Sequence, residues 1–76
     1  MNATESDQKL RALAEAAGMD VFDMLEEATY DGVAWGICTS PDCDYTTEVE
    51  PDQDAGWCEV CGTPTVKSCL RLAGLI

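Results

Sequence analysis

Two short stretches decide how this chain folds: CTSPDC at residues 38–43 and CEVCG at residues 58–62. Each holds a pair of cysteines at a place where the chain is expected to turn back on itself. The predicted ligands are Cys38, Cys43, Cys58 and Cys61. Four soft thiolates are the ligand set of one closed tetrahedral metal site. The spacing therefore predicts that one metal ion holds the domain together.

Chains of this length often need a staple, which can be disulfides, a metal or a partner. A single domain of 76 residues, 1–76, buries little apolar surface. The chain has five cysteines, and an odd number cannot all pair as disulfides. It opens without a basic, apolar leader, and no apolar run is long enough to span a bilayer, so we expect a cytoplasmic protein that does not bind membranes. Paired cysteines in that reducing compartment favour a metal over disulfides.

The composition is strongly acidic. The chain has fifteen acidic and four basic residues, which gives a formal net charge of −11, and it has no histidine. The bases are Lys9, Arg11, Lys67 and Arg71, near the two ends of the chain. Binding of DNA or RNA needs cations that displace counterions from phosphates, so the composition argues against nucleic acid and anionic lipid as partners. The acidity indicates either a self-repelling, solvated surface or a basic protein partner.

Residues 6–17 predict a first helix, after a frayed segment at residues 1–5. Ser6 suits the N-cap position. An apolar stripe then recurs at helical spacing and is formed by Leu10, Leu13, Ala14 and Ala17. Gly18 suits a left-handed C-cap. The helical part of the domain is therefore expected to begin at residue 6 and to extend, with a second helix, to residue 32.

The second helix is expected directly after a tight corner. Asp20 can cap its start, with Asp23 three residues further on, and Gly32 ends it. The expected core residues of this region are Met19, Phe22 and Met24. The corner resembles the turn of a helix-turn-helix. The second helix, however, carries acids where a DNA-reading helix needs polar and basic residues, so we expect no DNA binding.

Three short antiparallel strands are predicted in the cysteine-rich part, residues 33–68. They are expected at residues 33–37, 45–50 and 65–68, from their alternating pattern and their apolar, β-branched residues. Residues 51–56 have the composition of a loop, and Thr63 and Pro64 that of a turn. The second strand is therefore expected to be followed by an irregular connection to the second cysteine pair.

The two cysteine pairs are expected to form loops of different width. The second pair has the spacing of a tight knuckle, in which backbone N–H groups point at the sulfurs and Gly62 takes a left-handed conformation. Trp57 is expected to anchor this knuckle by packing. The first pair has two more intervening residues, and Asp44 stands where a glycine would help. We therefore expect a wider first loop.

The segment from Gly36 to about Leu70 resembles a zinc ribbon, in which two cysteine knuckles at the tips of hairpins share one zinc ion. The resemblance rests on CDYTTEVEP at residues 43–51 and GWCEVCGT at residues 56–63, and it covers just under half of the chain. These motifs are also similar to those of small, uncharacterised bacterial zinc-ribbon proteins with a short helical N-terminus. The resemblance implies one zinc ion held by the four cysteines, and it implies no activity.

The same cysteines give a less complete resemblance to rubredoxins, which are small acidic proteins that hold iron and carry one electron. Residues 43–45, the acidic loop around Pro51 and residues 57–62 are similar to that pattern. The first knuckle is two residues longer, Asp44 replaces the usual glycine, and Glu59 stands where proline is usual. Because four thiolates alone do not choose between zinc and iron, iron is the alternative to zinc.

Residues 69–76 form the most apolar stretch of the chain, and we expect them to pack on the N-terminal helices. Cys69 is expected to be a small buried side chain rather than a reactive thiol or a further ligand. The predicted fold is thus a small α+β metal-bound domain. A two-helix corner at residues 6–32 is followed by a zinc ribbon of three short antiparallel strands at residues 33–68 and by this apolar segment.

The chemistry of the site indicates a binding protein rather than an enzyme. Four thiolates fill the shell of the metal and leave no position for water or substrate. No nucleophile–base pair is recognisable either, so we expect no catalytic residues. The expected function is a structural-zinc protein-binding module or adaptor with an acidic surface, whose partner is another protein. The alternative is a rubredoxin-like iron electron carrier that uses the same four cysteines.

Overall fold

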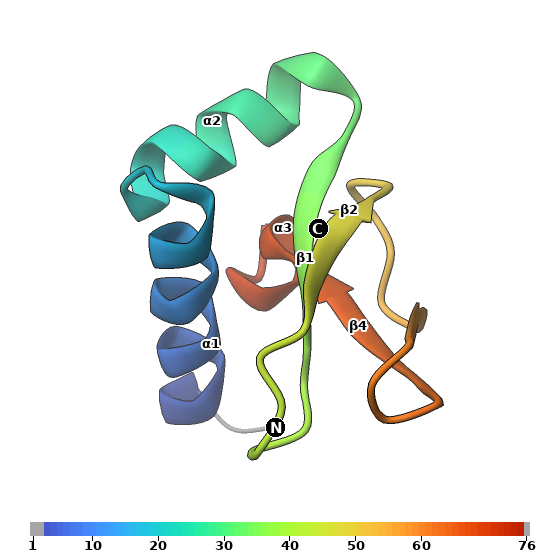
Figure 1. Ribbon diagram of the computed structural model, residues 1–76. Helices are drawn as coiled ribbons and strands as arrows, with labels where there is room; N and C mark the ends of the chain where they lie inside the picture. Colours follow the sequence, from blue (N-terminus) through green and yellow to red (C-terminus); the bar gives the residue numbers. More distant parts are fainter. Residues whose placement is uncertain (1–2, 76) are drawn as a thin grey trace.

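Two helices pack against a curled antiparallel sheet in the computed structural model, which describes residues 3–75 (Figure 1). The helices are α1 (Ala3–Ala17), α2 (Val21–Asp31) and a short α3 (Cys69–Leu72). The strands are β1 (Ala34–Cys38), β2 (Thr46–Val49), β3 (Gly56–Cys58) and β4 (Thr63–Ser68). The sheet has the order β2-β1-β4-β3, and all its neighbours are antiparallel. The predicted α+β class is confirmed.

The first helix begins earlier than its sequence pattern predicted. α1 starts at Ala3 rather than after a cap at Ser6, so residues 3–5 are helical where a frayed segment was expected. Residues 1–2 of that expected segment lie outside the described residues. Glu5 stands in the first turn, where the positive end of the helix dipole stabilises a carboxylate. This favourable charge is a physical reason for the longer helix.

The predicted caps are present between α1 and α2 and at the end of α2. Gly18 follows the last residue of α1 with a φ of 74°, and Gly32 follows α2 with a φ of 69°. The Asp20 carboxylate accepts a hydrogen bond of 2.8 Å from the backbone N–H of Asp23. This bond satisfies one of the free donors in the first turn and fixes the start of α2.

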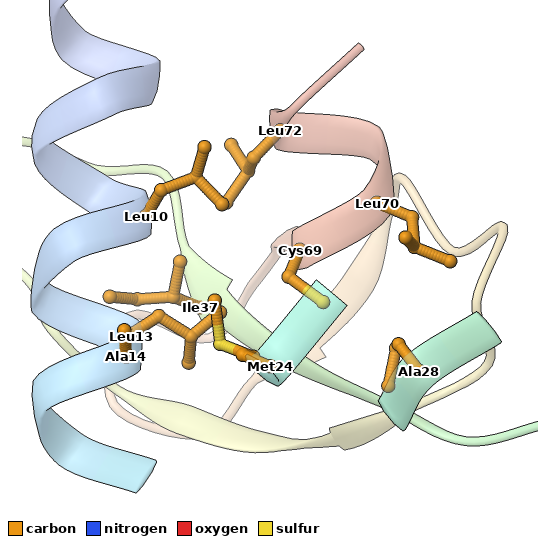
Figure 2. Packing of buried hydrophobic residues seen from close by; sticks show 10 residues of the cluster. Leu10, Leu13, Ala14, Met24, Ala28, Ile37, Cys69, Leu70 and Leu72 are labelled. Carbon is orange, nitrogen blue, oxygen red and sulfur yellow. The ribbon is translucent and has the colours of Figure 1, made fainter. Parts of the chain in front are cut away.

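A core under the helices joins α1, α2, β1 and α3 (Figure 2). Its buried side chains are Leu10, Leu13, Ala14, Met24, Ala28, Ala34, Ile37, Cys69, Leu70 and Leu72. α1 supplies the predicted stripe, apart from Ala17, which is only half-buried. α3 supplies three of the buried residues, so the apolar C-terminal segment packs against the helices through them. Leu75 is exposed, and Ile76 lies outside the described residues.

Phe22 does not belong to this core, so the prediction for it is wrong. Its side chain is 84% exposed, and Met19 is only half-buried. The buried face of α2 is set by Met24 and Ala28, which lie one turn apart. Phe22 comes two residues before Met24, which is about 200° around the helix. It therefore faces away from the core and leaves an aromatic ring on the surface.

The sheet has four strands where three were predicted. The additional strand is β3, and β4 begins at Thr63 rather than at Thr65. A proline usually marks the end of a strand because it has no N–H for the ladder, which is why a turn was predicted at Pro64. β4 accommodates Pro64 because β1 pairs with β4 only from Val66 to Ser68. The missing donor therefore lies beyond the part of β4 that β1 covers.

The centre of β1 requires a residue without a side chain. Gly36 pairs with both neighbouring strands, β2 and β4. A Cβ atom on Gly36 would lie 2.8 Å from Val49 Cγ2, 2.9 Å from Val66 Cγ1 and 3.1 Å from the backbone oxygen of Lys67. Val66 belongs to the second core cluster, with Cys38, Cys43 and Cys58, and Val49 packs against that cluster. Packing in the centre of the sheet and packing around the cysteines are therefore linked.

We expect Gly36→Ala to lower the free energy of unfolding by about 1–3 kcal/mol, because it overpacks the space between three strands. Urea denaturation measures the loss. Val49→Ala removes the nearest clashing methyl group, so the double variant should lose less stability than the sum of the two single variants. Strictly additive losses would show that overpacking against Val49 is not the cause.

Candidate metal centre

Two hairpins bring the cysteine loops to the same end of the sheet. The first loop joins β1 to β2 and contains Cys43, and the second joins β3 to β4 and contains Cys61. Because β1 and β4 are antiparallel neighbours, the end of β1 lies beside β4, where Cys38 pairs with Val66. Cys38 and Cys58 are the last residues of their strands, and both are fully buried at 0% exposure.

The structure brings together all four cysteines that the spacing predicted as ligands. The Sγ atoms of Cys38, Cys43, Cys58 and Cys61 lie within 4.8 Å of one another. Cys38 Sγ is 3.8 Å from Cys61 Sγ, and Cys43 Sγ is 3.7 Å from Cys58 Sγ. A tetrahedral metal with bonds of about 2.3 Å to sulfur places its sulfurs about 3.8 Å apart, whereas a disulfide needs about 2.05 Å. The group could therefore hold one metal ion.

The second cysteine loop has the predicted form of a tight knuckle. The backbone N–H of Cys61 donates to Cys58 Sγ at 3.3 Å, so a peptide dipole points at a candidate ligand. The N–H of Gly62 donates to the carbonyl oxygen of Cys58 at 2.8 Å, and Gly62 has a φ of 68°. That dihedral angle is the left-handed region that a side chain resists. These predictions for residues 58–62 are confirmed.

The first cysteine loop is wider and is organised by different contacts. The N–H of Cys38 donates to the Tyr45 carbonyl oxygen at 2.9 Å, which closes the base of the loop. The N–H of Cys43 donates to the Ser40 carbonyl oxygen at 3.2 Å, so it does not point at a sulfur as in the second loop. The Thr65 hydroxyl lies 3.1 Å from Cys38 Sγ. A side chain from β4 thus supplies a polar contact to the first candidate ligand.

The thiols of Cys38, Cys43 and Cys61 differ in the direction in which their pKa is shifted. Burial raises the pKa of Cys38, but hydrogen bonds, above all with the Thr65 hydroxyl, lower it to about 6. The backbone of Tyr45 lowers the pKa of Cys43, but burial and the neighbouring thiols raise it to about 12. A hydrogen bond with a neighbouring thiol lowers the pKa of Cys61, yet burial and the other thiols leave it raised. A cation at the centre is what would allow all four sulfurs to ionise together.

A lysine from α1 closes the wide first loop. The Lys9 ammonium donates to the carbonyl oxygens of Ser40 at 2.6 Å and of Cys43 at 2.5 Å. It also lies 3.4 Å from Asp44 Oδ1. Lys9 is only 7% exposed. An ammonium has three N–H donors and no acceptor, so these contacts occupy all of its donors.

Lys9 is a residue of the site that sequence reasoning missed, as is Thr65. Lys9 lies 31 residues before Ser40 and 35 residues before Asp44, so no spacing rule connects them. Its position in the helix gave one signal: Lys9 comes one turn before Leu13, on the edge of the apolar stripe. A lysine at such a place must extend its head to water or find buried acceptors. The carbonyl groups of the first cysteine loop are those acceptors.

One edge of the cysteine cluster is open to solvent. Cys61 is exposed, whereas the other three candidate ligands are buried. Val60 is exposed, and Trp57 is 60% exposed, so the prediction that Trp57 anchors the knuckle is wrong. Successive residues of a strand face opposite sides. Because Gly56 and Cys58 of β3 face inward, Trp57 between them faces outward.

Cys69 lies apart from the metal cluster. It is fully buried among the apolar side chains of the helical core, as Figure 2 shows. Burial raises the pKa of its thiol, so at neutral pH the side chain is uncharged. This environment agrees with the prediction that Cys69 acts as a small apolar side chain.

Comparisons with protein-family models, with curated proteins and with solved structures found no match to this chain. Within residues 3–75, none of the helices is long and apolar enough to cross a membrane.

Proposed function

We propose that this chain is a zinc-ribbon module that binds a basic protein partner through the outer face of α2. Zinc is the metal we propose because four thiolates at tetrahedral spacing form a closed structural site. The wide first loop, 38–43, also departs from the tight knuckle of the iron-binding rubredoxin pattern. In such a site the metal supplies folding energy and is not available for catalysis. Function then has to come from the surface that the metal stabilises.

The observation that carries this proposal is the composition of the α2 outer face. We define this face by the exposed residues Phe22, Asp23, Glu26, Glu27, Tyr30 and Asp31. Phe22 and Tyr30 are 84% and 79% exposed and stand at the two ends of one row, with Glu26 between them. This spacing of four residues places the three side chains on one side of the helix. The row thus alternates aromatic, acidic and aromatic side chains.

The second row of the α2 outer face is wholly acidic. Asp23, Glu27 and Asp31 follow one another at the same spacing of four residues. Like charges at this spacing destabilise a helix, and Asp31 stands at the end where the helix dipole is negative. The ion pairs of Lys9 with Asp44, Arg11 with Asp7 and Arg71 with Asp54 all lie outside α2. The acidic row therefore lowers the stability of α2, and cations from a partner would offset this cost.

Hollows lie on both sides of this acidic row. One hollow of about 150 Å³ lies between α2 and the sheet and is lined by Glu27, Asp31, Glu48 and Trp35, among others. The other, of about 410 Å³, lies on the far side of the row and is lined by Glu26, Tyr30 and Met19, among others. Arginine and lysine bind carboxylates by charge and aromatic faces by cation–π attraction. A partner segment with two or more basic side chains fits this arrangement.

A photo-crosslinking phenylalanine analogue tests the surface. It is placed at position 22 and, as a matched control, at position 16 on the exposed side of α1. The partner that is captured from the host extract is identified, purified and titrated against the unmodified chain. We expect Phe22→Ala with Tyr30→Ala to weaken binding by roughly tenfold or more, because exposed aromatic anchors dominate small interfaces. Glu15→Gln, an exposed acid on α1, is the control and should leave the affinity unchanged.

Two results would refute the proposed surface. One is an affinity that Phe22→Ala and Tyr30→Ala leave unaltered. The other is a partner that forms cross-links from position 16 and none from position 22. Exposed ion pairs are screened by salt. A binding constant that does not change between low and high salt would therefore show that the acidic residues do not contribute to binding.

One observation favours the alternative of an iron electron carrier. Cys61 is exposed, with exposed Val60 and Trp57 near it in the chain, so the centre comes close to the surface. Such an open edge is suitable for passing an electron. Elemental analysis of the purified protein separates the two metals. We expect one zinc per chain and no colour, and a red protein with one iron per chain would replace the zinc proposal.

A further inference from the structure

We infer that Lys9 is a positioning residue of the metal centre and makes metal binding and the docking of α1 depend on each other. The inference rests on the proposed metal site, but it does not depend on the partner. Its basis is the contact between a buried ammonium on α1 and two carbonyl oxygens of the first cysteine loop, Ser40 at 2.6 Å and Cys43 at 2.5 Å.

The wide first loop needs an external support. In the second loop the backbone closes on itself, with the N–H of Cys61 on Cys58 Sγ and the N–H of Gly62 on the Cys58 carbonyl oxygen. The first loop has two additional residues, and its Cys43 N–H donates to the Ser40 carbonyl oxygen rather than to a sulfur. The Lys9 ammonium donates to that same Ser40 oxygen and to the Cys43 oxygen. It therefore holds both ends of the segment from Ser40 to Cys43.

The chemistry of lysine fits this position better than that of other residues. Three acceptors converge on one nitrogen, which suits a compact ammonium and not the planar fork of arginine. A divalent ion with four thiolates carries a net charge of about −2, and Lys9 donates to the carbonyl of a ligand residue, Cys43. The ammonium therefore lies where it offsets the charge of the loaded site. Groups that support metal ligands in this way stabilise the bound metal.

The coupling follows from the position of Lys9 in the fold. Leu10 and Leu13, its neighbours on α1, are buried in the helical core, so the helix and the loop are tied through one side chain. If docked α1 holds the loop in its metal-binding shape, then bound metal must hold α1 by the same free energy, because coupling is reciprocal. Metal binding would thereby stabilise the docking of α1 as well as the cysteine loops.

The test compares Lys9→Met with Arg11→Met. The first keeps an apolar stem and removes the ammonium, and the second removes an exposed cation two residues away. Competition with a chromophoric chelator measures zinc affinity, and excess chelator measures the rate of zinc loss. We expect Lys9→Met to weaken zinc binding by roughly 10- to 100-fold and to speed zinc loss, whereas Arg11→Met leaves both unchanged. Lys9→Arg should restore only part of the affinity, and the ligand-field spectrum of bound cobalt should shift in Lys9→Met.

A zinc affinity and release rate in Lys9→Met equal to those of the unaltered chain would overturn the inference. If Lys9→Met does not fold, Lys9→Arg decides, because it keeps a cation and an apolar stem at the same place. A zinc affinity and release rate in Lys9→Arg equal to those of the unaltered chain would then overturn the inference. An unaltered chain that binds no zinc would instead refute the proposed metal site, so the two failures are distinguishable.

Discussion

Cys58→Ser is expected to leave the whole domain unfolded in the presence of zinc. Cys58 ends β3 and lies 3.7 Å from Cys43 Sγ, and its Sγ accepts the N–H of Cys61. A serine hydroxyl is a poor ligand for a soft-metal site, so the metal loses one quarter of its shell. In small domains of this kind metal-binding energy is folding energy, on the order of 10 kcal/mol or more. The ¹H–¹⁵N spectrum of the variant should therefore be collapsed and its zinc content close to zero.

Cys69→Ala is the matched control, because it removes a buried thiol that lies outside the metal cluster. We expect it to fold, to keep its zinc and to lose only about 1–2 kcal/mol, the usual cost of a small truncation in a core. A dispersed spectrum for Cys58→Ser would show that the metal is not the staple of the fold. Loss of zinc in Cys69→Ala would show that the ligands have been assigned wrongly.

The candidate site was the most predictable part of the molecule because its determinants are local. The distance along the chain between Cys58 and Gly62 fixes a knuckle almost without reference to the rest of the fold. The helix caps at Gly18 and Asp20 were predictable for the same reason, since capping satisfies backbone groups within one turn. The pairing of the two cysteine loops then required only that two hairpins lie side by side.

The features that sequence reasoning missed depend on contacts between distant segments. Phe22 was assigned to the core because it is apolar, but the burial of an 11-residue helix is decided by which face meets the sheet. Trp57 was assigned a packing role, but the pleat of β3 turns it outward. Lys9 was counted only as a charge, because its carbonyl partners lie more than 30 residues away. In each case tertiary geometry, rather than residue type, decided the outcome.

Because Phe22 is exposed, the acidic outer face of α2 also carries large apolar side chains. Phe22 and Tyr30 on α2 are exposed to water, and within residues 3–75 no aromatic side chain is fully buried. Large exposed apolar groups beside charges are typical of recognition surfaces. The failed core prediction and the proposed binding face are therefore the same observation.

Zinc affinity is expected to fall by at least roughly 100-fold for each pH unit below neutrality, because thiols must lose their protons to bind metal. In the folded chain the pKa of Cys43 is raised to about 12 and that of Cys61 is also raised. In an unfolded chain a cysteine has a pKa of about 8.5, so both thiols carry protons at pH 7 without metal in either state. Bound zinc keeps them ionised, which means that it lowers their pKa. The stabilisation by metal is therefore present at high pH and is lost as the pH falls.

Calorimetric zinc titrations in buffers with different ionisation enthalpies count the protons released, and chelator competition from pH 8 to about pH 6 gives the slope of affinity against pH. We expect release of two or more protons at pH 7. Cys69→Ala should give the same number and the same slope, because the Cys69 thiol belongs to the helical core and not to the cluster. A pH-independent affinity, or a proton count that changes in Cys69→Ala, would mean that zinc is held by groups other than these four thiolates.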